Sequence, residues 1–194
     1  MNSTTASFTR FWRKFSLALG LLVACLSCGA MAQAEGITVK SAGLELVDDA
    51  YQLSASFDVE FTQTINDAIN RGLALPFLIE YEITRPRWYW WNKTVAEGSR
   101  PRQISYNALT RQYRLTVGSL YQNFERLEDV KQVLASLRGI DVAERGLLEK
   151  GEPYEVALRM RLDVARLPKP FQVNALASRE WNLPSDWHRF KFIP

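Results

Sequence analysis

One stretch near the start of the chain limits the possible folds more than any other. From residue 51 to residue 61, apolar side chains occupy every second position and polar side chains stand between them. The apolar members are Tyr51, Leu53, Ala55, Phe57, Val59 and Phe61. Side chains of a strand point alternately to its two faces, whereas a helix would scatter these residues around its circumference. The stretch therefore predicts a long β-strand with one buried and one solvated face.

Further strands are expected along the chain. Residues 77–84 and 154–164 alternate in the same way, and residues 37–46 have the composition of a first strand. Residues 102–108 and 112–117 predict a hairpin, since apolar alternation resumes on both sides of a short polar connection. Long strands with one-sided burial and short connections are typical of antiparallel sheet.

Two helices interrupt this pattern. Residues 62–71 predict a short helix, with Thr64 as its N-cap and Gly72 as its end. Residues 126–138 predict a second, because their apolar residues recur every three or four positions until Gly139. The expected fold is mainly β: an antiparallel β-sandwich or twisted antiparallel sheet with two short helices. The alternative is a one-layer α+β arrangement with both helices on one sheet face.

The first 34 residues have the composition of a secretory signal peptide. Three basic residues precede an apolar run over residues 15–26, and small residues follow it. Two alternatives remain open: a lipid anchor at Cys25, which ends a lipobox-like Leu-Val-Ala-Cys sequence, or an uncleaved N-terminal anchor. Residues 35–194 are then expected to form a single mainly-β domain, exported to the periplasm.

Removal of this leader changes the charge and the thiol content. The leader holds three of the 24 basic residues and no acidic one, so the remainder carries 21 residues of each sign. Both cysteines, Cys25 and Cys28, also belong to the leader. The exported chain would have no disulfide and no cysteine nucleophile. An exported protein of neutral charge is not expected to bind nucleic acid.

The most unusual segment is Arg85-Pro86-Arg87-Trp88-Tyr89-Trp90-Trp91. If the strand over residues 77–84 continued through it, Tyr89 and Trp91 would share the core face. A bulge at Pro86 would instead turn Trp88 and Trp90 toward the core. In either register some rings face away from the core. Two hypotheses follow: the aromatic C-terminal tail covers these rings, or they form an exposed surface for a partner.

Charge favours the second hypothesis. Between residues 85 and 114 the chain has seven basic residues and one acidic residue. Aromatic rings beside arginines are the residue types that anchor interfaces. Internal salt bridges between this basic segment and the acidic remainder are the alternative. The candidate binding surface consists of Arg85, Arg87, Trp88, Tyr89, Trp90, Trp91, Arg102 and Arg111.

Several motifs in combination resemble a known family. In chain order they are Arg87-Trp88-Tyr89-Trp90-Trp91, Tyr106 with Leu109-Thr110-Arg111-Gln112-Tyr113, Tyr154 with Arg159, Arg161, Leu162 and Asp163, Leu167-Pro168-Lys169-Pro170, Trp181 and Trp187. The chain resembles an exported proteobacterial family of uncharacterised proteins, domain of unknown function 4390. The resemblance implies export and a single domain. It implies no activity, cofactor or catalytic residue.

Signatures of catalysis are scarce. The chain has one histidine, His188, and a zinc site is not expected without further histidines or cysteines. Glu80 and Glu82 share one strand face, which a solvated surface explains better than a pair of catalytic carboxylates. No cofactor or metal is expected. The predicted function is a non-catalytic periplasmic or cell-envelope module that binds a protein partner. A glycan-binding or anionic-lipid-binding module is the alternative, and an unrecognised enzyme is a third hypothesis.

Overall fold

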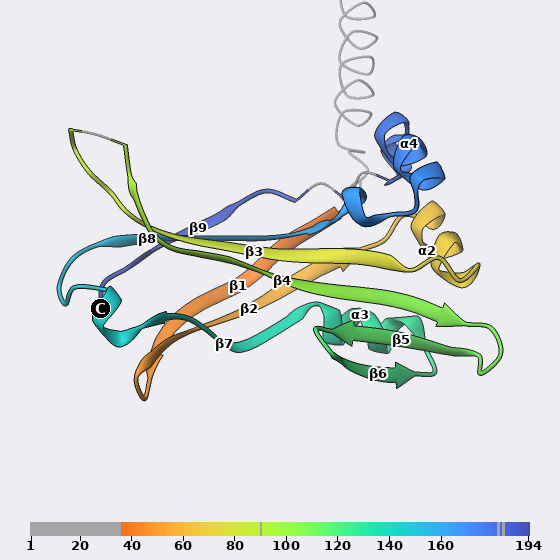
Figure 1. Ribbon diagram of the computed structural model, residues 1–194, viewed down its shortest axis with the longest axis horizontal. Coiled ribbons are helices and arrows are strands. Elements are labelled where there is room, and N and C mark those ends of the chain that lie inside the picture. The colour runs from red at the N-terminus through yellow and green to blue at the C-terminus, as the bar shows by residue number, and fades with distance from the viewer. Residues whose placement is uncertain (1–35, 90, 182, 184) are drawn as a thin grey trace, which may run out of the picture. The chain divides into compact units, whose positions relative to one another are not determined.

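The computed structural model describes residues 36–89, 91–181, 183 and 185–194. The predicted leader, including Cys25 and Cys28, lies outside the described residues. The described chain forms two antiparallel sheets (Figure 1). The first contains, in spatial order, β1 (Gly36–Val47), β2 (Ala50–Glu60) and β7 (Ser136–Glu144). The second contains, in spatial order, β6 (Leu120–Phe124), β5 (Gln112–Val117), β4 (Lys93–Asn107), β3 (Leu75–Arg85), β8 (Tyr154–Leu162) and β9 (His188–Phe192).

Both sheets bury one face in a common hydrophobic core. In β2 the predicted alternation is confirmed: the apolar positions from Tyr51 to Val59 are buried, and the residues between them are more exposed. Across the core, Phe61, which directly follows β2, stacks on Phe77 of β3, with ring centroids 5.6 Å apart. The mainly β prediction is confirmed. The two sheets exclude the one-layer alternative.

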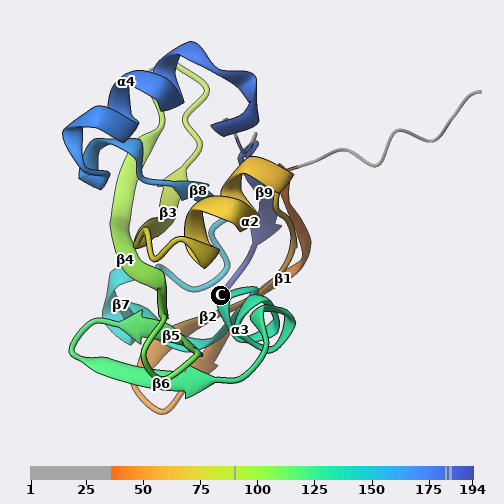
Figure 2. The same cartoon turned by 90° about the vertical axis from the view of Figure 1, so that its right-hand side faces the viewer.

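The first predicted helix is α2 (Gln63–Asn70), which lies between β4 and β1 in the view of Figure 2. Its N-cap is Thr62 and not Thr64, because the Thr62 hydroxyl accepts the Ile65 N–H at 3.2 Å. Its end is as predicted. Gly72 has a positive φ of 87°, which glycine adopts without steric cost, and the N–H of Leu73 donates to the carbonyl of Ala68 at 3.0 Å.

The second predicted helix is shorter than expected. Helix α3 spans Leu127–Leu134 and not residues 126–138. Helix α3 ends where the chain begins to pair with β2: the N–H of Phe57 donates to the carbonyl of Ala135 at 2.8 Å, and β7 begins at Ser136. Pairing with β2 outweighs the helical pattern, since the buried Leu137 suits either structure. Residues 140–143 form the second half of β7.

A third helix was not predicted. Helix α4 spans Lys169–Ala177 and begins within the Leu167-Pro168-Lys169-Pro170 motif. Pro168 is its N-cap and Pro170 lies in its first turn, where the missing N–H of proline removes no hydrogen bond. Three short 3-10 segments complete the described elements: η1 (Arg145–Leu147), η2 (Val164–Arg166) and η3 (Arg179–Trp181).

Candidate interaction surface at the β3–β4 loop

The aromatic segment forms the loop between strands β3 and β4. Strand β3 ends at Arg85, which pairs with Lys93, the first residue of β4. Pro86 ends the ladder because it has no N–H to donate. We define the aromatic loop by the described residues between the two strands, Pro86 to Tyr89 with Trp91 and Asn92. Trp90 lies outside the described residues. Both sequence-based registers are therefore wrong, since each assumed that the strand continues beyond Pro86.

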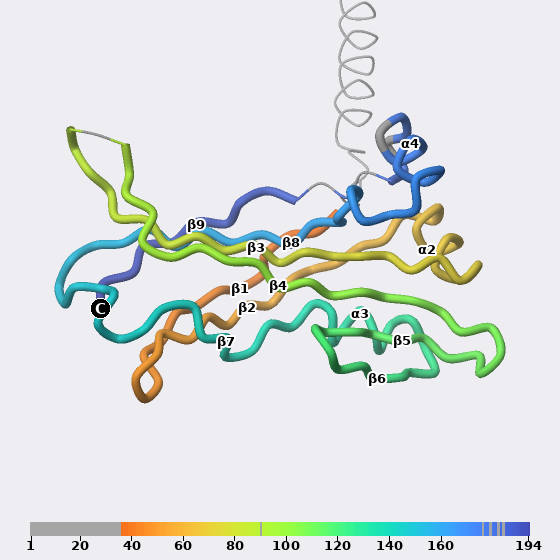
Figure 3. Tube along the Cα trace, viewed as in Figure 1, coloured from red at the N-terminus to blue at the C-terminus, as the bar shows by residue number. Residues whose placement is uncertain are grey.

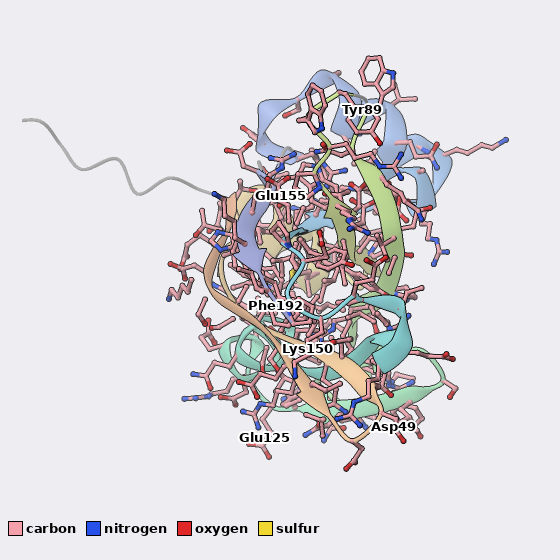
Figure 4. All side chains as sticks on the ribbon, turned by 90° about the vertical axis from the view of Figure 1, so that its left-hand side faces the viewer. Asp49, Tyr89, Glu125, Lys150, Glu155 and Phe192 are labelled. Carbon is pink, nitrogen blue, oxygen red and sulfur yellow. The ribbon has the colours of Figure 1, made fainter. Side chains whose placement is uncertain are left out.

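The described rings of this loop are open to solvent. Trp88 is 94% exposed, Tyr89 65% and Trp91 82%. Trp88 and Tyr89 contact each other edge to face, with centroids 5.2 Å apart. In Figure 4, Tyr89 lies at the periphery of the view, whereas the core-facing Phe192 lies near its centre. This placement satisfies the geometric requirement of a contact surface, which is access from outside.

The expected cover over these rings lies elsewhere. Trp181 is buried, with its ring 5.9 Å from that of Phe171 in α4. Trp187 stacks with the guanidinium of Arg159 at 4.5 Å. The hypothesis that Trp181 and Trp187 close over the aromatic run is therefore wrong for its described rings. The C-terminal tail instead packs Trp181 against Phe171 and Trp187 against Arg159, and it adds strand β9 to the edge of β8.

At the base of the loop, Arg85 is held within the protein. Its two terminal nitrogens contact Glu149 at 3.0 Å and Glu152 at 2.8 Å. These hydrogen bonds raise the pKa of Arg85 above its ordinary value, and the bond to Glu152 is the largest cause. Glu149 and Glu152 belong to the connection between β7 and β8, so the bridge ties that connection to the loop base. Of the two alternatives for the basic segment, internal salt bridges therefore apply to Arg85.

Arg102 belongs to the interior and is removed from the candidate surface. It is 9% exposed, and its Nη1 donates to the carbonyls of Val133 at 3.1 Å and Leu134 at 2.6 Å. Burial lowers its pKa below the ordinary arginine value. On β4 it pairs with the buried Phe77, which places its side chain on the core face. Sequence reasoning misplaced it because a charged residue in a strand ordinarily faces solvent.

Arg111 is exposed, but it lies far from the aromatic loop. It lies in the turn between β4 and β5 with a positive φ of 54°. The aromatic loop and this turn are at opposite ends of β4 (Figure 3). The basic segment of the sequence is therefore spread along one long strand and is not a single lobe. The residues that the structure brings together are Arg87, Trp88, Tyr89, Trp91 and the exposed Lys93.

The carboxylates of β3 are occupied by neighbouring side chains. Glu80 accepts hydrogen bonds from Arg161 at 2.9 and 3.0 Å and from Arg159 at 2.8 Å. The hydrogen bond from Arg161 is the largest cause that holds the pKa of Glu80 below its ordinary value, and Arg159 adds to it. Glu82 accepts from the Thr94 hydroxyl at 2.8 Å. An ionised Glu80 cannot act as a proton donor near neutral pH.

An open groove of about 540 Å³ lies between α2 and the α4–η3 segment. Phe171, Trp181 and Leu73 line it, and its titratable residues are Asp67 and Arg71. Asp67 accepts a hydrogen bond from Gln63 at 2.9 Å.

Among the described residues no three His, Cys, Asp or Glu side chains form a group that could hold a metal ion. None of the helices described has the length and hydropathy needed to cross a bilayer.

Fold and surface together define a class: a two-sheet antiparallel β protein that presents an aromatic and basic loop to solvent. Comparison with family models places the chain more narrowly. Residues 34–191 match the model described as "Domain of unknown function (DUF4390)". The chain belongs to this family. Neither the search of curated proteins nor that of solved structures gave a match.

Proposed function

We propose that this protein is a non-catalytic module of the cell envelope that attaches to another envelope component through the aromatic loop. The observation that carries the proposal is the exposure of Trp88, Tyr89 and Trp91. Each such ring offers about 150–250 Å² of surface. Together they present roughly 500 Å² of aromatic surface, which matches the largest apolar patch of a typical monomer, and such patches are often functional.

The loop also has the charge of a contact surface. Arg87 and Lys93 flank the rings, and no Asp or Glu occurs from Pro86 to Lys93. Guanidinium and ammonium groups beside Trp and Tyr favour partners that carry carboxylate or phosphate. The Arg85 bridge below the loop ties the end of β3 to the connection between β7 and β8, so a partner would meet a loop whose base is held on the β3 side.

Export is part of the same proposal. It is supported by the signal-peptide pattern over residues 1–34, by the restriction of both cysteines to that segment, and by the resemblance to exported proteobacterial proteins. A module held in the periplasm would meet envelope proteins, glycans and the anionic lipid of the membrane surface. A protein partner was the first expectation from the sequence, and glycan or anionic lipid the alternative.

Retention on isolated cell envelopes tests the proposal. The wild-type protein and a Trp88→Ala/Trp91→Ala variant would be incubated with washed envelopes, and the bound fraction measured after sedimentation. A matched control is Leu109→Ala/Leu120→Ala, which removes exposed apolar side chains (96% and 76% exposed) outside the loop. We expect the bound fraction to fall at least tenfold for the loop variant and to stay unchanged for the control. Equal retention of all three proteins would refute attachment through this loop.

A further inference from the structure

We propose that the aromatic loop is a membrane-surface anchor whose partner is an anionic lipid bilayer. This inference rests on the proposed function and names the partner of the same surface. The rings of Trp88 and Trp91 would lie at the boundary between headgroups and acyl chains. Arg87 and Lys93 would contact the anionic headgroups.

The shape of the loop favours a bilayer. The described loop residues lie at the end of a strand ladder, between two paired strands (Figure 3). A projecting loop with rings exposed by 65 to 94% must be enclosed from several sides before they all leave water. A fluid interface can surround such a loop, whereas a protein would need a matching deep pocket.

The residue types agree with this partner. Trp and Tyr concentrate at membrane interfaces because each has an apolar ring and a polar N–H or O–H that remains hydrated. Lys and Arg extend their charged ends toward headgroups from an apolar neighbourhood. The absence of acidic residues from Pro86 to Lys93 removes the repulsion that an anionic surface would otherwise exert.

The size of the surface also argues against a protein partner for the loop alone. A stable protein interface buries about 800 Å² on each partner. The three rings offer roughly 500 Å². The surface around the rings is polar, since Asn92, Lys93 and Thr94 are exposed and Arg85 is engaged with Glu149 and Glu152. The apolar surface thus ends where the loop meets the strands, which suits shallow insertion in an interface.

Vesicle sedimentation tests the inference. The full chain and its variants would be mixed with phosphatidylcholine vesicles that contain 30% phosphatidylglycerol, and with pure phosphatidylcholine vesicles. We expect Trp88→Ala/Trp91→Ala to lower the partition coefficient on the mixed vesicles at least tenfold. Arg87→Gln/Lys93→Gln should lower it about thirtyfold on the mixed vesicles at low salt and leave partition on the neutral vesicles unchanged.

Matched controls separate the loop from the rest of the chain. Leu109→Ala/Leu120→Ala and Arg111→Gln/Lys169→Gln remove apolar and basic side chains that are exposed outside the loop. The N-terminal segment is common to every protein, so any lipid affinity of its own is the same in all of them. Indole fluorescence supplies a direct signal. Lipids brominated near the headgroup should quench the emission of the wild type more than that of the Trp88→Ala/Trp91→Ala variant.

Two outcomes would overturn the inference. The first is equal partition of the wild type and the aromatic variant. The second is equal quenching of both by brominated lipid. If loop-dependent retention on whole envelopes then persists and is abolished by protease treatment of the envelopes, the partner is a protein. In that case the lipid inference fails while attachment through the loop stands. Loss of loop dependence in both assays rejects the two proposals together.

Discussion

The guanidinium of Arg102 donates to the carbonyl of Leu134 at 2.6 Å, so a strand of one sheet caps the C-terminus of helix α3. The same Nη1 donates to the carbonyl of Val133. The last carbonyls of a helix have no partner within it, and a cation there also interacts favourably with the helix dipole. These bonds explain why a charged residue is 9% exposed in the core.

Loss of this cap should destabilise the protein. We predict that Arg102→Ala lowers the free energy of unfolding by about 2–4 kcal/mol, because two carbonyls, that of Leu134 buried and that of Val133 partly buried, lose their donor and a cavity remains. Urea unfolding of the wild type and the variant measures this difference in the free energy of unfolding. Arg100→Ala is the control, since Arg100 is exposed and makes longer contacts of 3.3 and 3.4 Å to backbone carbonyls. The control should change stability by at most about 0.5 kcal/mol. Equal effects of both substitutions would contradict a capping role.

Glu80 predicts how stability depends on acid. Its pKa in the folded protein is held below the ordinary value of about 4.5, chiefly by the hydrogen bond from Arg161. A depressed folded-state pKa contributes stability that is present above the unfolded value and is lost as the pH falls through the folded value. The difference in unfolding free energy between wild type and Glu80→Gln should therefore be constant near neutral pH and shrink below about pH 4.5.

At neutral pH the Glu80→Gln substitution should cost about 1–3 kcal/mol, because two guanidinium groups lose their shared carboxylate. Glu82→Gln is the matched control on the same strand face, where Thr94 is the donor. Chemical unfolding from pH 3 to pH 7 measures both variants, and the control should show the smaller loss. Parallel pH profiles for the wild type and Glu80→Gln would show that the two arginines do not stabilise the Glu80 carboxylate.

The N-terminus of α2 offers a test of residue assignment. Thr62 is buried, accepts from the Ile65 N–H and donates to the carbonyl of Glu180 at 2.6 Å. Thr64 donates to the carboxylate of Glu180 in an exposed contact. We predict a loss of about 1–2 kcal/mol in unfolding free energy for Thr62→Ala and at most about 0.5 kcal/mol for Thr64→Ala. Thermal or urea unfolding distinguishes them, and the reverse order would restore Thr64 as the cap.

The aromatic loop should be dispensable for folding. Trp88→Ala/Trp91→Ala should leave the free energy of unfolding unchanged within about 0.5 kcal/mol, because neither ring packs against the core. Matching unfolding curves would show that any loss of envelope or vesicle binding reflects the surface itself. A loss of several kcal/mol would mean that the rings have a covered position in solution.

Local patterns were sufficient for most of the elements. The alternation in β2, β3 and β8 identified strands, because a side-chain period of two depends on neighbours in the sequence. Gly72 was identified as a helix end for the same local reason. The C-terminal limit of α3 could not be identified locally, since Leu137 fits both a helix and a strand and pairing with β2 decides between them. Helix α4 was missed because proline both ends strands and begins helices.

The sequence by itself determined the antiparallel β class and the residue types of a candidate surface, because both follow from periodicity and composition within short windows. Only the tertiary structure decided which arginines join that surface. Arg85 meets Glu149 and Glu152, Arg102 turns inward to the end of α3, and Arg111 lies at the far end of β4. Each outcome depends on residues distant in the chain, and no local pattern carries that information.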